Sequence, residues 1–114
     1  MIFREYDIRG IVGKELTPDL VELIGKAFGT YINGRSVVVG RDNRSSSLSL
    51  RDALVKGLTS AGCDVLDVGV LPSPLLYFSV VHYKKYAGVM ITGSHNPKEY
   101  NGLKLSKGTY PVFG

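Results

Sequence analysis

The sequence predicts an α/β fold: a three-layer α/β/α sandwich with a mostly parallel, mixed sheet, βαβ units and a C-terminal β-hairpin. Short β-branched runs alternate along the chain with longer segments in which apolar residues recur every three or four positions. Glycine, proline and serine separate the two patterns and mark the turns. Strands that alternate with helices are joined by right-handed crossovers, so the strands run parallel and helices lie on both faces. The chain has 114 residues, 44% of them hydrophobic, which is enough for one such domain with its own core.

The first helix is expected between Pro18 and Gly34. Thr17 is suited to cap it, Pro18 to occupy its first position and Asp19 to place an acid in its first turn. Its apolar stripe consists of Leu20, Leu23, Ile24, Ala27, Phe28 and Tyr31.

A buried strand over 36–39 comes next, followed by a polar loop over 40–47. The second helix then carries an inward stripe and stops at Gly62. That stripe consists of Leu50, Leu54, Val55, Leu58 and Ala61.

The pattern then repeats with a strand over 63–70. A third helix is expected from Pro74, capped by Ser73, to about Tyr86, with a further strand over 87–92. Residues 103–106 and 109–112 are expected to form the hairpin, turned by Lys107 and Gly108. Its last strand would be an exposed edge at the end of the sequence. We therefore expect residues 1–114 to be a single domain, excised as the first domain of a longer protein.

Charge, apolar runs and cysteine count exclude several classes of binding partner and location. The formal net charge is +4, but the basic residues are scattered and no nucleic-acid motif accompanies them, which favours small anions such as phosphate esters over nucleic acid. No apolar run approaches the ~20 residues needed to span a bilayer, and the charged first ten residues exclude a signal-peptide core. Cys63 is the single cysteine, so no internal disulfide is possible. We expect a cytoplasmic protein without a membrane or nucleic-acid partner.

Two polar segments follow predicted strands, 41–47 and 93–101. In parallel sheets, ligands bind beyond the carboxyl ends of the strands, so these segments are the first candidates for a site. Ser94 stands just past a buried strand, behind Gly93 and two residues before Asn96, and could be a nucleophile or a phosphate carrier. A turn of Gly, Ser, Asn and Pro without chemistry is the plain alternative. A serine hydrolase is disfavoured, because the G-x-S-x-G elbow is absent and nothing evident orients His95.

Cations could assist such a serine. Lys104 is expected on the polar face of its strand, since Leu103 and Leu105 point the other way, and it could equally be a solvated lysine. Arg9 ends a charged stretch unlike an ordinary first strand and has the geometry for phosphate. Arg44 could bind an anion, but pairing with Asp42 to brace the loop is favoured. For His82, packing is the default interpretation. Asp64 and Asp67 are three apart on a strand and so do not suggest a metal pair.

Four segments together resemble the first domain of the α-D-phosphohexomutase superfamily. They are 3–10 (Phe-Arg-Glu-Tyr-Asp-Ile-Arg-Gly), 39–44 (Val-Gly-Arg-Asp-Asn-Arg), 92–97 (Thr-Gly-Ser-His-Asn-Pro) and 101–104 (Asn-Gly-Leu-Lys). The last two are the most specific, and the order is the family's.

The resemblance implies that Ser94 is a phosphoserine that gives its phosphoryl group to one sugar hydroxyl and takes one back from another. A hexose 1,6-bisphosphate would be the intermediate and activator in the exchange of hexose 1-phosphate and 6-phosphate. His95 and Asn96 would flank the phosphate, Arg9 and Lys104 would stand near the reacting group with Lys104 as acid/base, and Tyr6 would lie close to substrate.

The resemblance also implies Mg²⁺, bound through the phosphate on Ser94. The family's other metal ligands come from an Asp-x-Asp-Gly-Asp loop that this sequence lacks. We therefore expect the remaining domains of the parent chain to be partners, and residues 1–114 alone to have negligible mutase activity.

The segments at 5–10 and 92–94 look like the phosphomannomutase/phosphoglucomutase branch. Phosphoglucosamine mutases usually show Thr-Asp-Gly-Ile-Arg-Gly at the first place and Ala before the serine. This departure is modest, and the residues by which the family chooses its sugar are not in this sequence, so glucosamine phosphate stays open as a substrate. A non-catalytic phosphosugar-binding module is the other alternative, and it should tolerate Ser94→Ala.

Overall fold

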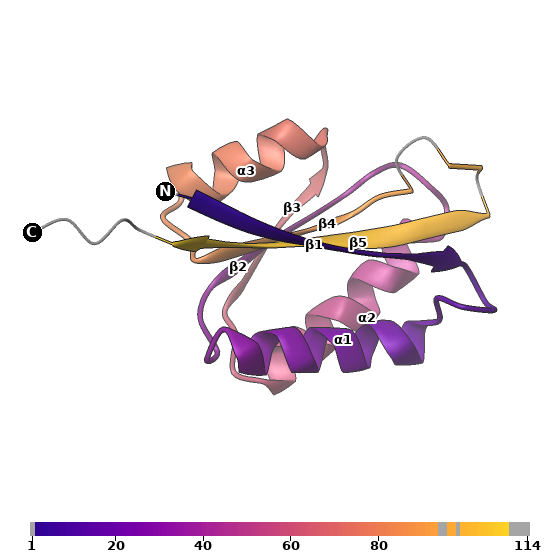
Figure 1. Cartoon of the computed structure of the whole chain (residues 1–114), viewed down its shortest axis with the longest axis horizontal. Helices are drawn as coiled ribbons and strands as arrows, with labels where there is room; N and C mark the ends of the chain where they lie inside the picture. The colour runs from indigo at the N-terminus through magenta and orange to yellow at the C-terminus, as the bar shows by residue number, and fades with distance from the viewer. Residues whose placement is uncertain (1, 94–95, 98, 110–114) are drawn as a thin grey trace, which may run out of the picture.

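A computed structural model describes residues 2–93, 96–97 and 99–109 of the chain. Its elements follow the order β1 (Ile2–Ile11), α1 (Pro18–Tyr31), β2 (Val37–Arg41), α2 (Ser47–Ser60), β3 (Val65–Val70), α3 (Ser73–His82), β4 (Ala87–Ile91) and β5 (Tyr100–Thr109). Figure 1 shows α3 on one face of the sheet, with α1 and α2 on the other. The predicted α/β/α sandwich is confirmed.

The sheet is mixed, with strand order β1-β5-β4-β2-β3 among the described residues. The neighbours β3, β2 and β4 are parallel, whereas β5 is antiparallel to both β4 and β1. β4 is buried along its whole length and β2 nearly so, as expected for apolar strands covered by helices on both faces.

The predicted C-terminal hairpin is wrong. β5 runs straight through Lys107 and Gly108, whose backbones are in register with Arg4 and Phe3 of β1. The charged N-terminal stretch, for which no strand was expected, is a ten-residue edge strand and takes the place of the hairpin's second arm. β5 is consequently an interior strand rather than an exposed edge. Residues 110–112, the remainder of the expected arm, lie outside the described residues.

The helix boundaries agree with the predictions except in α3. The Thr17 hydroxyl accepts the Leu20 amide at 3.2 Å and caps α1 as expected. Ser73 is the first residue of α3 rather than its cap, because the cap position belongs to Pro72. α3 ends at His82, earlier than the predicted Tyr86, and Lys84 follows with a left-handed φ of 56°.

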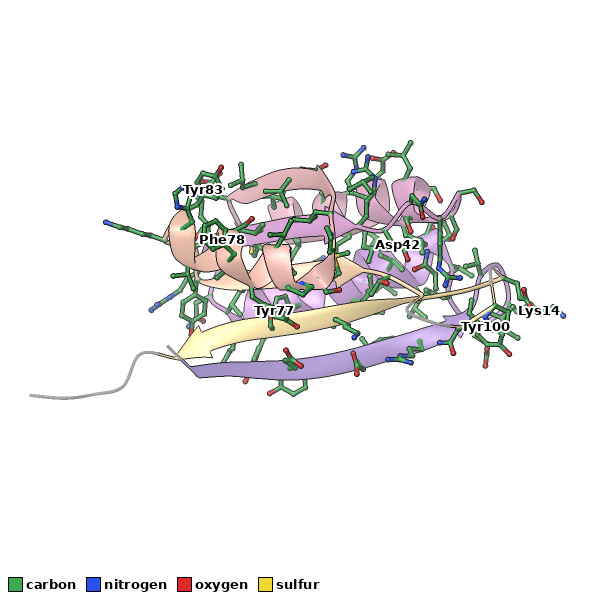
Figure 2. The ribbon with its side chains drawn as sticks, turned by 90° about the horizontal axis from the view of Figure 1, so that it is seen from above. Lys14, Asp42, Tyr77, Phe78, Tyr83 and Tyr100 are labelled. Carbon is green, nitrogen blue, oxygen red and sulfur yellow. The ribbon has the colours of Figure 1, made fainter. Side chains whose placement is uncertain are left out.

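The core is divided unequally between the two faces of the sheet. The larger cluster packs α1 and α2 against the strands and includes Phe28, Leu54, Leu58, Leu103 and Leu105. The smaller cluster, Val38, Leu76, Val80 and Met90, lies under α3, which packs mainly on β2 and β4. Viewed from the α3 side, β5 and β1 extend beyond the cover of that helix (Figure 2). Among the described residues, no helix combines the length and apolarity needed to cross a bilayer.

Candidate functional site

The two polar segments predicted as site candidates do meet at one end of the sheet. The loop after β2 begins with Asp42, whose amide donates to the carbonyl of Ile91 at the end of β4 (2.9 Å). Since β2 and β4 are parallel neighbours, their carboxyl ends bring the two loops side by side.

Asp42 is the hub of this contact. Its Oδ1 accepts the Ser47 hydroxyl (2.6 Å) and the Arg44 amide (3.1 Å), and its Oδ2 accepts the Gly93 amide (3.0 Å). Burial by itself raises the pKa of Asp42, but hydrogen bonds from Ser47, Gly93, Arg44 and Thr92 favour the carboxylate and leave the pKa below its ordinary value. Asp42 is therefore a structural anion that fixes the start of the second loop.

Arg44 holds described residues further along that loop. Its Nη2 donates to the carbonyl of Asn96 (2.8 Å), and its Nη1 donates to those of Pro97 (2.9 Å) and Tyr100 (3.2 Å). Its Nε donates to Asp42 at 3.2 Å, and only 16% of the side chain is exposed. A Cβ at position 93 would fall on the guanidinium, so any other residue there would displace Arg44 from this position. The predicted role of Arg44 as a brace for the loop is confirmed.

Asn101 completes this group. Its Nδ2 donates to the hydroxyls of Ser46 (2.8 Å) and Ser47 (3.0 Å), and its Oδ1 accepts the Gly102 amide (2.9 Å). Sequence reasoning gave no role to Asn101 or Ser47. The signal available in the sequence was an Asn-Gly pair at the end of a polar loop and directly before apolar Leu103. We call Asp42, Arg44, Ser47 and Asn101 the brace.

The paired strands β1 and β5 carry the predicted cations. Lys104 is in register with Asp7 of β1 and with Met90 of β4, so it lies on the α3 face, as Leu103 and Leu105 enter the opposite core. Arg9 shares that face, and its Nη2 lies 3.9 Å from Asp7 Oδ2. The structure thus brings Arg9 and Lys104 to one face of the ribbon.

Tyr6 lies on the other face of β1. It lines a groove of about 590 Å³ between β1 and α1, together with Ile8, Phe28 and Tyr31. The structure therefore does not bring Tyr6 together with Arg9 and Lys104.

Gly102 links the cations to the second loop. It is in register with Arg9, and its carbonyl accepts the Thr92 amide at 3.0 Å. An added Cβ would lie 2.6 Å from the Ile8 carbonyl oxygen and 3.1 Å from Arg9 Cγ, so only glycine allows β1 this close. Arg9 is thereby set beside the strand end from which the loop leaves.

On the same face, Tyr77 ties α3 to β1. Its hydroxyl donates to Glu5, and burial, reinforced by this bond and the nearby charges of Glu5 and Asp7, raises the pKa of Tyr77 far above its ordinary value. Figure 2 shows Tyr77 on the side of α3 that faces the two strands.

Ser94 and His95, predicted as phosphoryl carrier and neighbour, lie outside the described residues. Their flanking residues are described: the Asn96 amide donates to the Gly93 carbonyl at 3.0 Å, and both are held by the brace.

Other residues singled out in the sequence have structural partners. His82 stacks on Phe78, as its packing interpretation requires. Asp67 pairs with Arg51, and with Arg41 at 3.7 Å. Within the described part of the chain, no three His, Cys, Asp or Glu side chains gather as metal ligands would.

Comparison with known proteins gives a consistent result. Residues 1–109 match the family described as phosphoglucomutase/phosphomannomutase, alpha/beta/alpha domain I. A Thermococcus kodakarensis protein named phosphoglucomutase/phosphomannomutase is 49% identical over 109 residues, which are 91% of this chain and 24% of that protein. A Pyrococcus abyssi protein named "Probable phosphoglucosamine mutase" is 50% identical over 98 residues, 86% of this chain and 22% of that protein.

A solved structure is similar over nearly the whole chain. It is a phosphoglucomutase/phosphomannomutase family protein from Burkholderia thailandensis, 42% identical with a TM-score of 0.79, matched over 90% of this chain and 25% of that one. The chain thus spans about a quarter of the length of these relatives.

Proposed function

This chain belongs to the phosphoglucomutase/phosphomannomutase family as its α/β/α domain I, and we propose that it supplies the phosphoserine, Ser94, of a hexose-phosphate mutase. The activity proposed for the whole protein is the exchange of mannose or glucose 1-phosphate with the 6-phosphate. Hexose 1,6-bisphosphate is its intermediate and activator.

One observation supports this proposal above the others: the brace holds both residues that flank positions 94 and 95. Asp42 holds Gly93 and Arg44 holds Asn96. The same loop starts beside Gly102, which faces Arg9 across the β1–β5 pair. A phosphoryl carrier needs such fixed positioning, because transfer passes through a loose transition state in which alignment and charge cancellation supply most of the catalysis.

Each residue then has a chemical role in the transfer. The bond between phosphorus and the Ser94 oxygen breaks while a sugar hydroxyl forms a new bond to the phosphorus. The Lys104 amine takes the proton of that hydroxyl, and the resulting ammonium supplies a proton to the Ser94 oxygen, which leaves as a free hydroxyl; the reverse step moves the proton back to the sugar oxygen. Arg9 stabilises the charge on the transferring group as a bidentate donor, and His95 and Asn96 flank the phosphate. Tyr6, on the other face of the edge strand, is proposed to contact the sugar beyond the edge rather than the phosphate.

Mg²⁺ enters the proposal only through the phosphate on Ser94. The described residues do not form a magnesium site of their own, since no carboxylate cluster is present among them and Asp42 is occupied by the brace. Any further ligands are proposed to come from outside this sequence. Within the chain, charge cancellation rests on Arg9, joined by Lys104 once that amine has taken the proton.

The sugar is the less determined part of the proposal. The relatives include proteins named for glucosamine as well as for glucose and mannose. We favour glucose and mannose, because Tyr6-Asp7 and Thr92-Gly93 resemble that branch, and keep glucosamine as the alternative.

The test is a coupled mutase assay on a protein that carries this sequence as its first domain, with mannose, glucose and glucosamine 1-phosphates. Ser94→Ala should abolish turnover, Lys104→Arg should reduce it severely, and Ser49→Ala on the exposed side of α2 should leave it unchanged. Residues 1–114 alone should show negligible turnover. If Ser94→Ala binds the sugar phosphates normally and the wild type turns over none of them, the chain is a binding module instead.

A further inference from the structure

A second group of cations lies at the opposite end of the sheet from the brace. Arg35 and Ser36 precede β2, and Lys84, Lys85 and Tyr86 lead from α3 into β4. Together these five residues line a pocket of about 330 Å³. In Figure 2, Tyr83, next to Lys84 in the sequence, lies at the far end of the molecule from Asp42 and Tyr100.

The pocket is held together by contacts between its two segments. The Tyr86 amide donates to Ser36 at both the carbonyl oxygen (3.1 Å) and the hydroxyl (3.2 Å). The Arg35 guanidinium carbon lies 4.6 Å from the centroid of the Tyr86 ring, a cation–π distance that orients this arginine. These contacts fix the two segments of the pocket relative to each other.

The cations of this pocket differ in their ion pairs from those at the other end of the sheet. None of the ion pairs among the described residues involves Arg35, Lys84 or Lys85. By contrast, Arg41, Arg44 and Arg51 at the other end of the sheet are all paired with aspartates. Three cations around one concavity repel one another unless an anion is bound.

The backbone at Lys84 adopts an unusual conformation for a lysine. In the part of the chain that the structure describes, each helix is followed by a left-handed residue: α1 by Asn33 (φ 59°), α2 by Gly62 (φ 91°) and α3 by Lys84 (φ 56°). Glycine and asparagine adopt this conformation readily, whereas for lysine it carries a steric cost of roughly 1–2 kcal/mol. The conformation closes α3, because the Lys85 amide donates to the Val80 carbonyl (2.9 Å) and the Lys84 amide to the Val81 carbonyl (3.1 Å). This cap fixes where both lysines leave the helix.

We propose that Arg35, Lys84 and Lys85 form a binding pocket for a small phosphate-bearing anion, separate from the mutase site. The volume is at the lower end of the range for small-ligand sites and suits a phosphate or pyrophosphate group. Arg35 supplies a planar fork of donors, and the two lysines act as point charges. The proposal does not depend on the proposed mutase activity.

The experiment is an amide NMR titration of the 114-residue chain with inorganic phosphate and then pyrophosphate, at ionic strength held constant with sodium chloride. Saturable shifts at residues 35, 36 and 84–86 are expected, with pyrophosphate the tighter ligand. If only pyrophosphate saturates these amides, the natural ligand carries more than one phosphate; if both do, a single phosphate group is sufficient.

Lys84→Gly should fold, because Gly62 has the same left-handed conformation at the same place after α2. We expect it and Lys85→Gln each to weaken binding about tenfold, while Lys26→Gln, an equal charge loss on α1, changes nothing. Unsaturable shifts spread over all exposed lysines, or equal weakening by Lys26→Gln, would overturn the proposal. Saturation confined to residues 92–104 would do the same, since it would place phosphate at the mutase site alone.

Discussion

The brace and the open face of β1 and β5, which carries Asp7, Arg9 and Lys104, are neighbours in the fold. Their polar side chains differ in exposure and in the number of protein contacts that they make. In the brace, the Asp42 and Arg44 side chains are 21% and 16% exposed, and hydrogen bonds to nearby residues engage both of them. On the open face, the Asp7 and Arg9 side chains are 55% and 45% exposed, and their charged atoms lie 3.9 Å apart, a long distance for an ion pair.

This difference indicates which residues can serve a ligand. A charged group already committed to several protein hydrogen bonds would have to lose them to bind substrate, whereas Arg9 loses only a weak surface pair. The brace should therefore determine stability, and the open face should determine chemistry.

Asp42, the hub of the brace, should be the position at which a substitution costs the most stability. Asp42→Asn should lower the free energy of unfolding by about 3 kcal/mol, because it replaces an acceptor of several bonds and leaves Arg44 partly buried without its counter-charge. Urea unfolding of the 114-residue chain measures this. Asp52→Asn is the matched control, since that carboxylate is 67% exposed, and it should cost no more than about 0.5 kcal/mol. Equal losses in both variants would contradict the structural role of the brace.

Gly93→Ala should cost about 2 kcal/mol, because the new Cβ displaces the Arg44 guanidinium from its carbonyl partners. If this is the mechanism, Gly93→Ala should cost much less in an Arg44→Ala background, and a double-mutant cycle in urea measures that coupling. Additive losses would show that Gly93 matters for a reason other than Arg44.

Periodicity predicted most of the fold because α2 and the parallel strands carry their burial in their own sequences. It placed α1 correctly but gave it the wrong buried face: Leu20, Leu23 and Tyr31 are exposed, and the buried residues include Val21, Gly25 and Gly29, because α1 packs closely on α2. It failed for β1, where Arg4, Glu5, Asp7 and Arg9 hide an edge strand with one uncovered face. Pairing between β1 and β5 connects residues about a hundred positions apart, which no local pattern reports. The hairpin prediction failed for the same reason, since Lys107-Gly108 looks like a turn until its distant partner is known.

The candidate site was predictable where polar residues follow buried strands. The pairing of Asp42 with Arg44 could be proposed because the two residues are only two positions apart in one loop. The contacts of Arg44 with Asn96 and Asn101 with Ser47 span more than 50 residues and depend on the parallel register of β2 and β4. The opposite placement of Tyr6 and Arg9 follows from strand parity, which could be read only once β1 was known to be a strand.

The brace should also make stability depend on acid. Because hydrogen bonding lowers the pKa of Asp42 in the folded state, its contribution is complete above the ordinary value of 3.8 and is lost as the pH falls through the folded pKa. The difference in unfolding free energy between wild type and Asp42→Asn should thus shrink when urea unfolding is repeated from about pH 6 down to about pH 3. A difference that stays constant over this range would mean that the Asp42 charge does not stabilise the loop.

Arg9, on the exposed face of β1 and β5, should contribute much less to stability than the brace does. Arg9→Gln should change the free energy of unfolding by less than about 0.5 kcal/mol, since an exposed pair at this distance contributes little. Arg51→Gln is the control: that arginine is 25% exposed and bonded to both Asp52 and Asp67, so urea unfolding should show a loss of about 1 kcal/mol. A loss at Arg9 as large as at Arg51 would place Arg9 among the structural cations. If Arg9→Gln leaves the free energy of unfolding unchanged but abolishes turnover in a protein carrying this domain, Arg9 acts on the phosphoryl group and not on stability.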